Sequence, residues 1–312
     1  MTENLHDWMR VGIVQFMLYP GCISGTGPIV ETTAKIVERN FFDVIELGPI
    51  NDPVVRQDTI AVCSQARIGI AYDGQPLTLL PGLDLEAVEA CNRQTAIDAM
   101  KRGIDEAAEM NSETCGVMSG KFWPRDLDVA AATARLRDSL VELCTYAAPA
   151  GITLCLENFD QHPYSKDCLI GPTPMAAELA VAVKAETSNF GLLPDLSHTP
   201  IIPETARFMV ENAYPHIVRT QIGNGSNDPY SAYYGDDHPY FGAALTQVGI
   251  PELTEFIQAL VDVGFLNKET PGIVGFEVKP KSGENPEAIM AGCERALNEA
   301  WSHVTVPVEN HI

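Results

Sequence analysis

Three acidic side chains stand at the ends of apolar runs, where an ionised group is costly to bury. Glu157 follows the apolar run that begins at residue 152, Asp195 ends the run that begins at 190, and Glu277 ends the run that begins at 272. A buried carboxylate needs a cation, a hydrogen-bonding network or a raised pKa. A structural ion pair or a solvated position would explain any one of the three. Their equivalent positions on three runs indicate one shared site instead.

A neutral amide, Gln221, lies near the end of a fourth run of the same kind, residues 217–222. Two Glu, one Asp and an amide oxygen form the oxygen-rich set that hard divalent cations prefer. We therefore predict a metal site made by Glu157, Asp195, Gln221 and Glu277. Mn²⁺ is the expected metal, with Mg²⁺, Co²⁺ or Fe²⁺ as alternatives.

Two histidines follow the acids closely in the sequence. His162 lies five residues after Glu157 and is a candidate general acid or base, because imidazole titrates near neutral pH. The alternative is a solvent-facing loop histidine. His198 lies three residues after Asp195 and is expected to orient substrate or a metal-bound water, unless it caps the start of a helix.

Two charged side chains near other run ends are candidate substrate contacts. Lys279 lies two residues beyond Glu277, and it either anchors a substrate hydroxyl or neutralises that carboxylate. Glu46 ends an early apolar run and is a candidate acid on the substrate side, with a structural role as the alternative.

A long segment, residues 223–272, separates the last two apolar runs. Its first part is aromatic and acidic, and it supplies Asp236, Asp237 and His238 as hydrogen-bonding candidates for a substrate. Long loops in compact domains are usually lids or interfaces. The Tyr and Phe rings are expected to stack against a sugar or a flat aglycone; a self-packed loop or a subunit contact is the alternative.

The elements that must position these residues alternate along the chain. Short apolar runs predict strands at 11–17, 43–47, 67–72, 114–118, 152–158, 190–195, 217–222 and 273–278. Helical periodicity is found at 29–38, 85–110, 129–148, 175–184, 205–212, 252–263 and 286–301. Asp84 and Asp128 are expected N-caps, and Pro251 suits a first helical turn.

Eight strands, each followed by a segment long enough for a helix, predict a parallel sheet covered by helices. One α/β domain over residues 1–312, a closed (β/α)8 TIM barrel, fits this pattern best, and its chemistry would sit at the carboxyl ends of the strands. A doubly wound open sheet is the competing fold. The glycine-rich run at 21–27 lacks the G-x-G-x-x-G spacing typical of that fold.

Composition excludes several classes of function. Lys and Arg number 20 against 42 Asp and Glu, a formal charge of −22, which argues against a nucleic-acid-binding surface. No apolar run reaches the roughly 18 residues of a membrane span, and residues 1–10 do not resemble a signal peptide. The eight cysteines are scattered without a C-x-x-C pair, so we expect reduced thiols in a cytoplasmic protein.

The positions of Glu157, Asp195, His198 and Glu277 resemble those of the xylose-isomerase-like barrels of the AP endonuclease 2 type, which include sugar epimerases. In those epimerases matching Glu, Asp, His and Glu residues hold a divalent metal, and the two Glu move a proton at a sugar carbon. The resemblance therefore implies Glu157 and Glu277 as catalytic residues. It is incomplete at the seventh strand, where Gln221 stands in place of the expected His.

A narrower resemblance concerns the barrel subunit of bacterial C-glycoside deglycosidases. It rests on Lys166 and on four segments, residues 157–160, 169–172, 221–224 and 234–242. Such enzymes cleave the carbon–carbon bond of a 3-keto C-glycoside and pair the barrel with a small β-rich subunit. This resemblance implies a carbon–carbon lyase in a hetero-oligomer.

Two enzymatic hypotheses follow. The first is a metal-dependent lyase that deprotonates a 3-keto C-glycoside next to its carbonyl and releases the aglycone. The second is a keto-sugar isomerase or epimerase with the same early chemistry and no partner chain. In both, Glu157, Glu277 and His162 are the catalytic candidates, while His198, Lys279, His238 and Glu46 are the substrate contacts. A DNA-repair nuclease is disfavoured by the acidic charge, and a non-enzymatic scaffold would require that Gln221 marks the loss of the metal.

Overall fold

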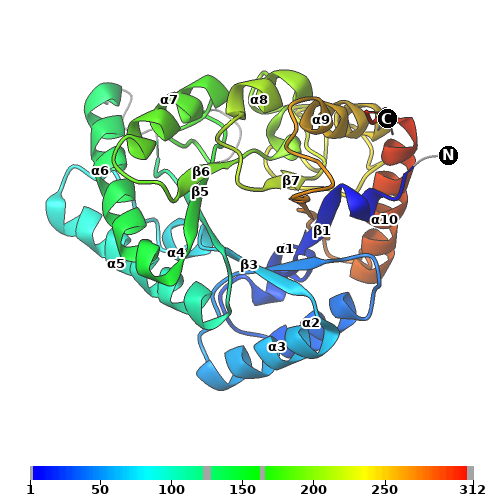
Figure 1. The fold of residues 1–312 in the computed structure, drawn as a ribbon, viewed down its shortest axis with the longest axis horizontal. Helices are drawn as coiled ribbons and strands as arrows, with labels where there is room; N and C mark the ends of the chain where they lie inside the picture. The colour runs from blue at the N-terminus through cyan, green and yellow to red at the C-terminus, as the bar shows by residue number, and fades with distance from the viewer. Residues whose placement is uncertain (1–2, 122–127, 162–165, 308–312) are drawn as a thin grey trace.

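A ring of parallel strands forms the centre of the molecule (Figure 1). The computed structural model describes residues 3–121, 128–161 and 166–307. Within these ranges the strands are β1 (Met9–Val14), β2 (Val44–Leu47), β3 (Gly69–Asp73), β4 (Thr114–Met118), β5 (Thr153–Glu157), β6 (Phe190–Leu193), β7 (Thr220–Ile222) and β8 (Gly272–Phe276).

The strands pair in the order β6, β5, β4, β3, β2, β1, β8, β7, and every pairing is parallel. Single parallel bridges, Leu192 with Ile217 and Asp195 with Gln221, join the β6 and β7 ends of this order. The eight described strands therefore form a nearly closed barrel. The predicted TIM barrel is confirmed.

The longer helices surround the strands on the outside of the barrel (Figure 1), and two single-turn helices of the described chain lie at the mouth of the barrel. Among the described residues the helices are α1 (Gln15–Leu18), α2 (Ile29–Val37), α3 (Pro53–Ala66), α4 (Pro76–Leu79), α5 (Ala90–Glu109), α6 (Val129–Ala147), α7 (Thr173–Lys184), α8 (Ala206–Ala213), α9 (Ile250–Asp262) and α10 (Pro286–His303). The Asp128 side chain accepts a hydrogen bond from the Ala131 N–H at 3.0 Å, which confirms it as the N-cap of α6. Pro251 lies in the first turn of α9, as expected.

Several predicted elements differ at their ends; the strand expected at 217–222, for example, begins only at Thr220. The expected helix at 85–110 begins only at Ala90, and Asp84 is not its N-cap, because its carboxylate accepts the Lys121 N–H instead. The expected strand at 11–17 ends at Val14. The chain turns into α1 there, and the Gln15 side chain donates to Thr32 Oγ1 at 2.6 Å.

The two faces of each strand serve different purposes. On β2, Ile45 and Leu47 are buried in the layer between strands and helices, while Glu46 alternates to the barrel interior. There it lies close to Arg219 and Asp73, which are both fully buried.

All eight cysteines lie in the described part of the chain and are unpaired, and all but Cys91 are buried. Within the described ranges, the helices are too short or too polar to cross a membrane.

Candidate metal centre

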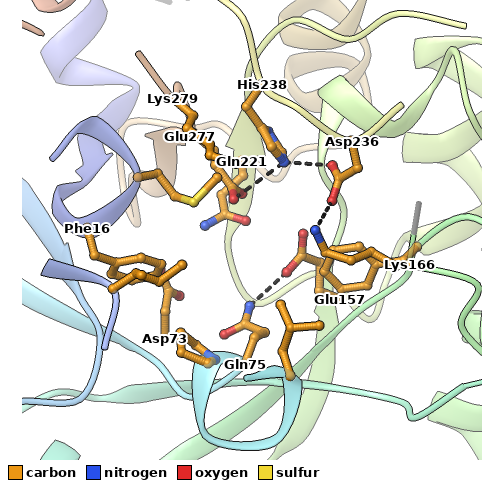
Figure 2. A pocket seen from close by; sticks show the side chains of 15 residues that line it. Phe16, Asp73, Gln75, Glu157, Lys166, Gln221, Asp236, His238, Glu277 and Lys279 are labelled. Carbon is orange, nitrogen blue, oxygen red and sulfur yellow. Dashed lines mark hydrogen bonds and ion pairs between the residues drawn. The ribbon is translucent and has the colours of Figure 1, made fainter. Parts of the chain in front are cut away.

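The acids at the carboxyl ends of the strands converge on one cavity. Glu157 is the last residue of β5, Gln221 lies in β7, and Glu277 directly follows β8. Figure 2 shows these three side chains in the wall of the cavity. Asp195, two residues beyond β6, lies behind them with no exposed surface. The sequence therefore predicted a set of residues that the fold does bring together.

One carboxylate oxygen from each of Glu157, Asp195 and Glu277 lies within 4.8 Å of the others. Glu157 Oε2 accepts a hydrogen bond from Gln75 Nε2 at 2.8 Å. Both Asp195 oxygens accept from Ser197, at 2.8 Å from its N–H and 2.6 Å from its hydroxyl. These bonds fix the orientation of two carboxylates whose other lone pairs remain available.

Three buried oxygens of this set, all in the described part of the chain, lack a hydrogen-bond partner: Glu157 Oε1, Gln221 Oε1 and Glu277 Oε2. An unsatisfied buried acceptor costs about 1–3 kcal/mol, more when it is charged. Such oxygens in one cavity are the donors that a hard divalent cation takes. The residues present therefore fit the metal that the sequence predicted.

The electrostatics of the site agree with this fit. Burial raises the pKa of Glu157 to about 8, against the opposing effect of His198. Burial, together with the charges of Glu157, Asp195 and Asp236, raises the pKa of Glu277 well above its ordinary value. Carboxylates that repel one another in a buried site favour either protons or a cation between them.

The side-chain amide of Gln221 is held by a buried carboxylate in the barrel interior. Its Nε2 donates to Glu46 Oε2 at 3.0 Å, and Arg219 pairs with the same oxygen. Burial raises the pKa of Glu46 to about 8, against the effect of Arg219. Glu46 is fully buried and lies outside the cavity wall, so the structure places it behind a candidate ligand rather than in contact with substrate.

A second cluster borders the carboxylates and has Asp236 at its centre. Asp236 Oδ1 lies 3.1 Å from His198 Nε2 and 2.6 Å from His238 Nε2, and Oδ2 lies 2.7 Å from Lys166 Nζ. Although burial opposes ionisation, Lys166, His238 and His198 hold the pKa of Asp236 well below its usual range. The cluster joins the loop after β5 to the loop after β7 across the mouth of the barrel.

His198 contacts oxygen atoms through both ring nitrogens. Its Nδ1 lies 2.8 Å from the Asn158 carbonyl oxygen, and its Nε2 lies 3.6 Å from both Glu157 Oε1 and Asp195 Oδ2. Burial opposes its charge, but the surrounding carboxylates, Asp195 first, raise its pKa to about 10. His198 therefore counterbalances the acids and is not an N-cap; the preceding Asp195 caps the short 3-10 helix (Leu196–His198).

His238 also reaches the metal-site acids. Its Nε2 lies 3.6 Å from Glu277 Oε1, and its Nδ1 lies 3.1 Å from Ser197 Oγ. Asp195, His198 and His238 form a second group with the spacing of a metal site. Because Asp236 engages Nε2 of both histidines, the carboxylates and Gln221 fit a metal better than this second group does.

Lys279 lines the cavity, and its Nζ lies 3.4 Å from Asp237 Oδ1. Its backbone N–H donates to the His238 carbonyl at 2.7 Å, so the end of β8 holds the long loop in place. His162, the predicted acid or base, lies outside the described residues. Sequence reasoning did not foresee the central position of Asp236, which it named only among hydrogen-bonding candidates of the loop.

Comparisons with known proteins agree with this architecture. The profile of the family described as "Xylose isomerase-like TIM barrel" matches residues 40–299. No protein of curated function matches the sequence significantly.

Solved structures with the same fold are similar over almost the whole chain. An L-ribulose 3-epimerase is 16% identical with a TM-score of 0.71, covering 94% of this chain and 95% of its own. A 3-keto-D-glucoside 4-epimerase from E. coli is 15% identical with a TM-score of 0.67, covering 93% and 99%. An AP endonuclease, family 2, from Brucella melitensis is 18% identical with a TM-score of 0.67, covering 91% and 97%. The chain belongs to the xylose isomerase-like TIM barrel family.

Proposed function

We propose that this protein is a divalent-metal-dependent enzyme that moves a proton at a carbon next to a sugar carbonyl, as a keto-sugar epimerase or isomerase. The observation that carries the proposal is the set of buried oxygens on Glu157, Gln221 and Glu277 that lack a hydrogen-bond partner and share one cavity among the described residues. The sugar epimerases among the similar structures support it.

Glu157, Asp195, Gln221 and Glu277 would hold the metal, with Mn²⁺ as the first candidate. When bound, a divalent cation supplies positive charge beside the sugar carbonyl oxygen and so acidifies the neighbouring C–H bond. The donor set is all oxygen, which is typical of Mn²⁺ and Mg²⁺ sites rather than of thiolate-bound metals.

Glu157 and Glu277 are the proton carriers. Inversion at a carbon requires one group to take the proton and another to return it from the opposite face. Both carboxyls line the cavity that would hold the sugar, so each can take or return a proton there. His162, outside the described residues, stays a predicted acid or base.

The polar residues around the acids would hold the sugar hydroxyls. Lys279, Lys166 and His238 line the same cavity as the two Glu. His198, fully buried between Glu157 and Asp236, would orient these acids rather than meet the sugar directly.

A second candidate function, C-glycoside cleavage, is favoured by the opposite wall of the cavity. Phe16, Met17, Ile23, Pro76 and Leu79 line it with apolar surface. A free keto-sugar carries hydroxyls all around its ring, whereas a glycoside presents a flat apolar group beside them. This wall suits an aglycone, and a small β-rich partner subunit remains part of that hypothesis.

The test is a proton-exchange assay of the Mn²⁺-loaded protein in D₂O. D-fructose, L-ribulose and 3-keto-glucosides are followed by NMR for loss of the C–H signal next to the carbonyl and for new epimers. Glu277→Gln is expected to abolish exchange, while Glu269→Gln, an exposed acid outside the cavity, serves as the matched control.

The products separate the two functions. A new epimer or isomer supports the first, and release of a free aglycone from a 3-keto C-glycoside supports the second. Bound Mn²⁺ with neither exchange nor release from any of these compounds would refute both.

A further inference from the structure

The carboxylate of Glu46 occupies a prepared space inside the barrel. A side chain at Gly275 would overlap Glu46 Oε1, and a Cβ at Gly12 would lie 3.1 Å from the same oxygen. Gly12 and Gly275 are register partners on β1 and β8, next to β2. Two paired glycines therefore provide the room in which this carboxylate lies.

Glu46 is held there by a fully buried cation. Arg219 Nη1 donates to Glu46 Oε2, while Arg219 Nη2 donates to Asp73 and to the Tyr72 carbonyl. Arg219 offers only donors and an ionised carboxylate only acceptors. The pair fixes Glu46 Oε2 at one place, directly below Gln221.

The Gln221 amide has two different ends, and this arrangement selects between them. Its Nε2 donates to Glu46 Oε2, which also accepts from Arg219. With the amide reversed, its oxygen would face a carboxylate oxygen, and neither could donate. A proton on the Glu46 carboxyl would reside on Oε1, between the two glycines, and would leave this preference unchanged.

The other end of the amide, Oε1, is buried and lacks a hydrogen-bond partner among residues 3–121, 128–161 and 166–307. Gln221 lies in the cavity wall, beside Glu277 (Figure 2). The fixed amide thus presents an oxygen acceptor, and not its NH₂ group, to the acidic site.

We propose that Glu46, held by Arg219, is a positioning residue that locks the Gln221 amide with its oxygen toward the metal. The inference rests on the proposed metal site and adds the reason why a glutamine serves there. An amide that rotates freely would present NH₂, which has no lone pair for a cation, in part of the molecules. Locking removes that state and strengthens metal binding.

The first experiment measures the Kd for Mn²⁺ by calorimetry on metal-stripped full-length protein. Glu46→Gln is expected to weaken binding about tenfold, as is typical when a residue supporting a metal ligand is replaced. In a Gln221→Ala background, the same substitution is expected to change the Kd by less than about twofold, because the amide it orients is gone. Glu86→Gln is the matched control, since Glu86 is a buried acid that accepts the Gly120 N–H and lies outside the cavity that Gln221 lines.

The second experiment reads the amide orientation without metal. In ¹⁵N-glutamine-labelled protein, the Gln221 side-chain amide, assigned by its loss in Gln221→Ala, is expected to show one slowly exchanging N–H. This measurement uses the wild-type fold and so decides the question even where Glu46→Gln does not fold.

The outcomes distinguish the inference from the proposed function. Wild-type protein that binds Mn²⁺, with an unchanged Kd in Glu46→Gln or an equal loss in Glu86→Gln, overturns the positioning role alone. Rapid exchange of both Gln221 amide protons overturns it as well. Wild-type protein that takes up no Mn²⁺ overturns the metal site itself, together with the role assigned to the locked oxygen.

Discussion

Arg219 is the only residue of the described chain placed to neutralise Glu46 and Asp73 at once, and its replacement by Met is predicted to be severely destabilising. All three side chains are almost completely inaccessible. Removing one member of a buried ion pair typically costs about 3–5 kcal/mol, because the remaining charge has no solvent. At roughly 2 °C per kcal/mol for a chain of this size, the melting temperature falls by about 6–10 °C.

The loss of stability in Arg219→Met is also predicted to become larger as the pH rises. Arg219 opposes the burial that raises the pKa values of Glu46 and Asp73, so without it both rise further. The folded variant then holds protons that the unfolded chain releases near pH 4, and stability falls as pH rises. The destabilisation relative to wild type is therefore larger at pH 8 than at pH 5.

Thermal and urea unfolding of Arg219→Met at both pH values measures this. Arg137→Met is the matched control, since Arg137 is only partly buried on α6 and its ion pair with Asp138 is screened by solvent and contributes little. A loss below about 1 kcal/mol at pH 8, or a loss that is equal at the two pH values, would refute the reasoning.

Three further predictions concern the site. Metal-free wild-type protein loses stability as the pH rises from 5 to 8. Burial raises the pKa of Glu157 and of Glu46 to about 8, so the folded state keeps protons that the unfolded state gives up. Midpoints of urea unfolding that stay constant or rise with pH would contradict this prediction. Asp236→Asn lowers the melting temperature and raises KM for the sugar, because Lys166 and two imidazoles lose their shared anion. Asp237→Asn is the control: its partners are partly exposed lysines, and its stability changes by less than about 1 kcal/mol. Equal effects of the two substitutions would argue against a role for the Asp236 cluster. Glu157→Gln lowers the rate of C–H exchange by about a thousandfold while the fold stays intact. NMR in D₂O measures the exchange, and circular dichroism checks the fold. A normal exchange rate would remove Glu157 from the mechanism.

Much of this site follows from one feature of the sequence, an acid at the end of an apolar run. Glu157 and Glu277 belong to such runs, and parallel strands bring their carboxyl ends to one edge. The grouping of these side chains around one cavity could be predicted for that reason. Their detailed roles, and that of His162, stay predictions that only the experiments above test.

The contact by which Glu46 holds Gln221 could not be predicted, because it joins two strands across the barrel. Glu46 and Gln221 are 175 positions apart, and their strands are separated by β1 and β8. Asp236 lies in an irregular loop with no periodicity to place it. Helix α3 was not singled out because its pattern is unusual: Val54 is 67% exposed, while Arg56 is buried beside Glu106 and Glu109.

The central claim is that four oxygen donors at the carboxyl ends of β5, β6, β7 and β8 hold one divalent metal. Elemental analysis of the protein purified without an affinity tag, repeated after Mn²⁺ loading, tests it most directly, with Asp195→Asn as the comparison. The account predicts close to one metal per chain for wild type and far less for the variant. Wild-type protein that is metal-free and takes up no Mn²⁺, or a variant that loads as fully as wild type, would contradict it.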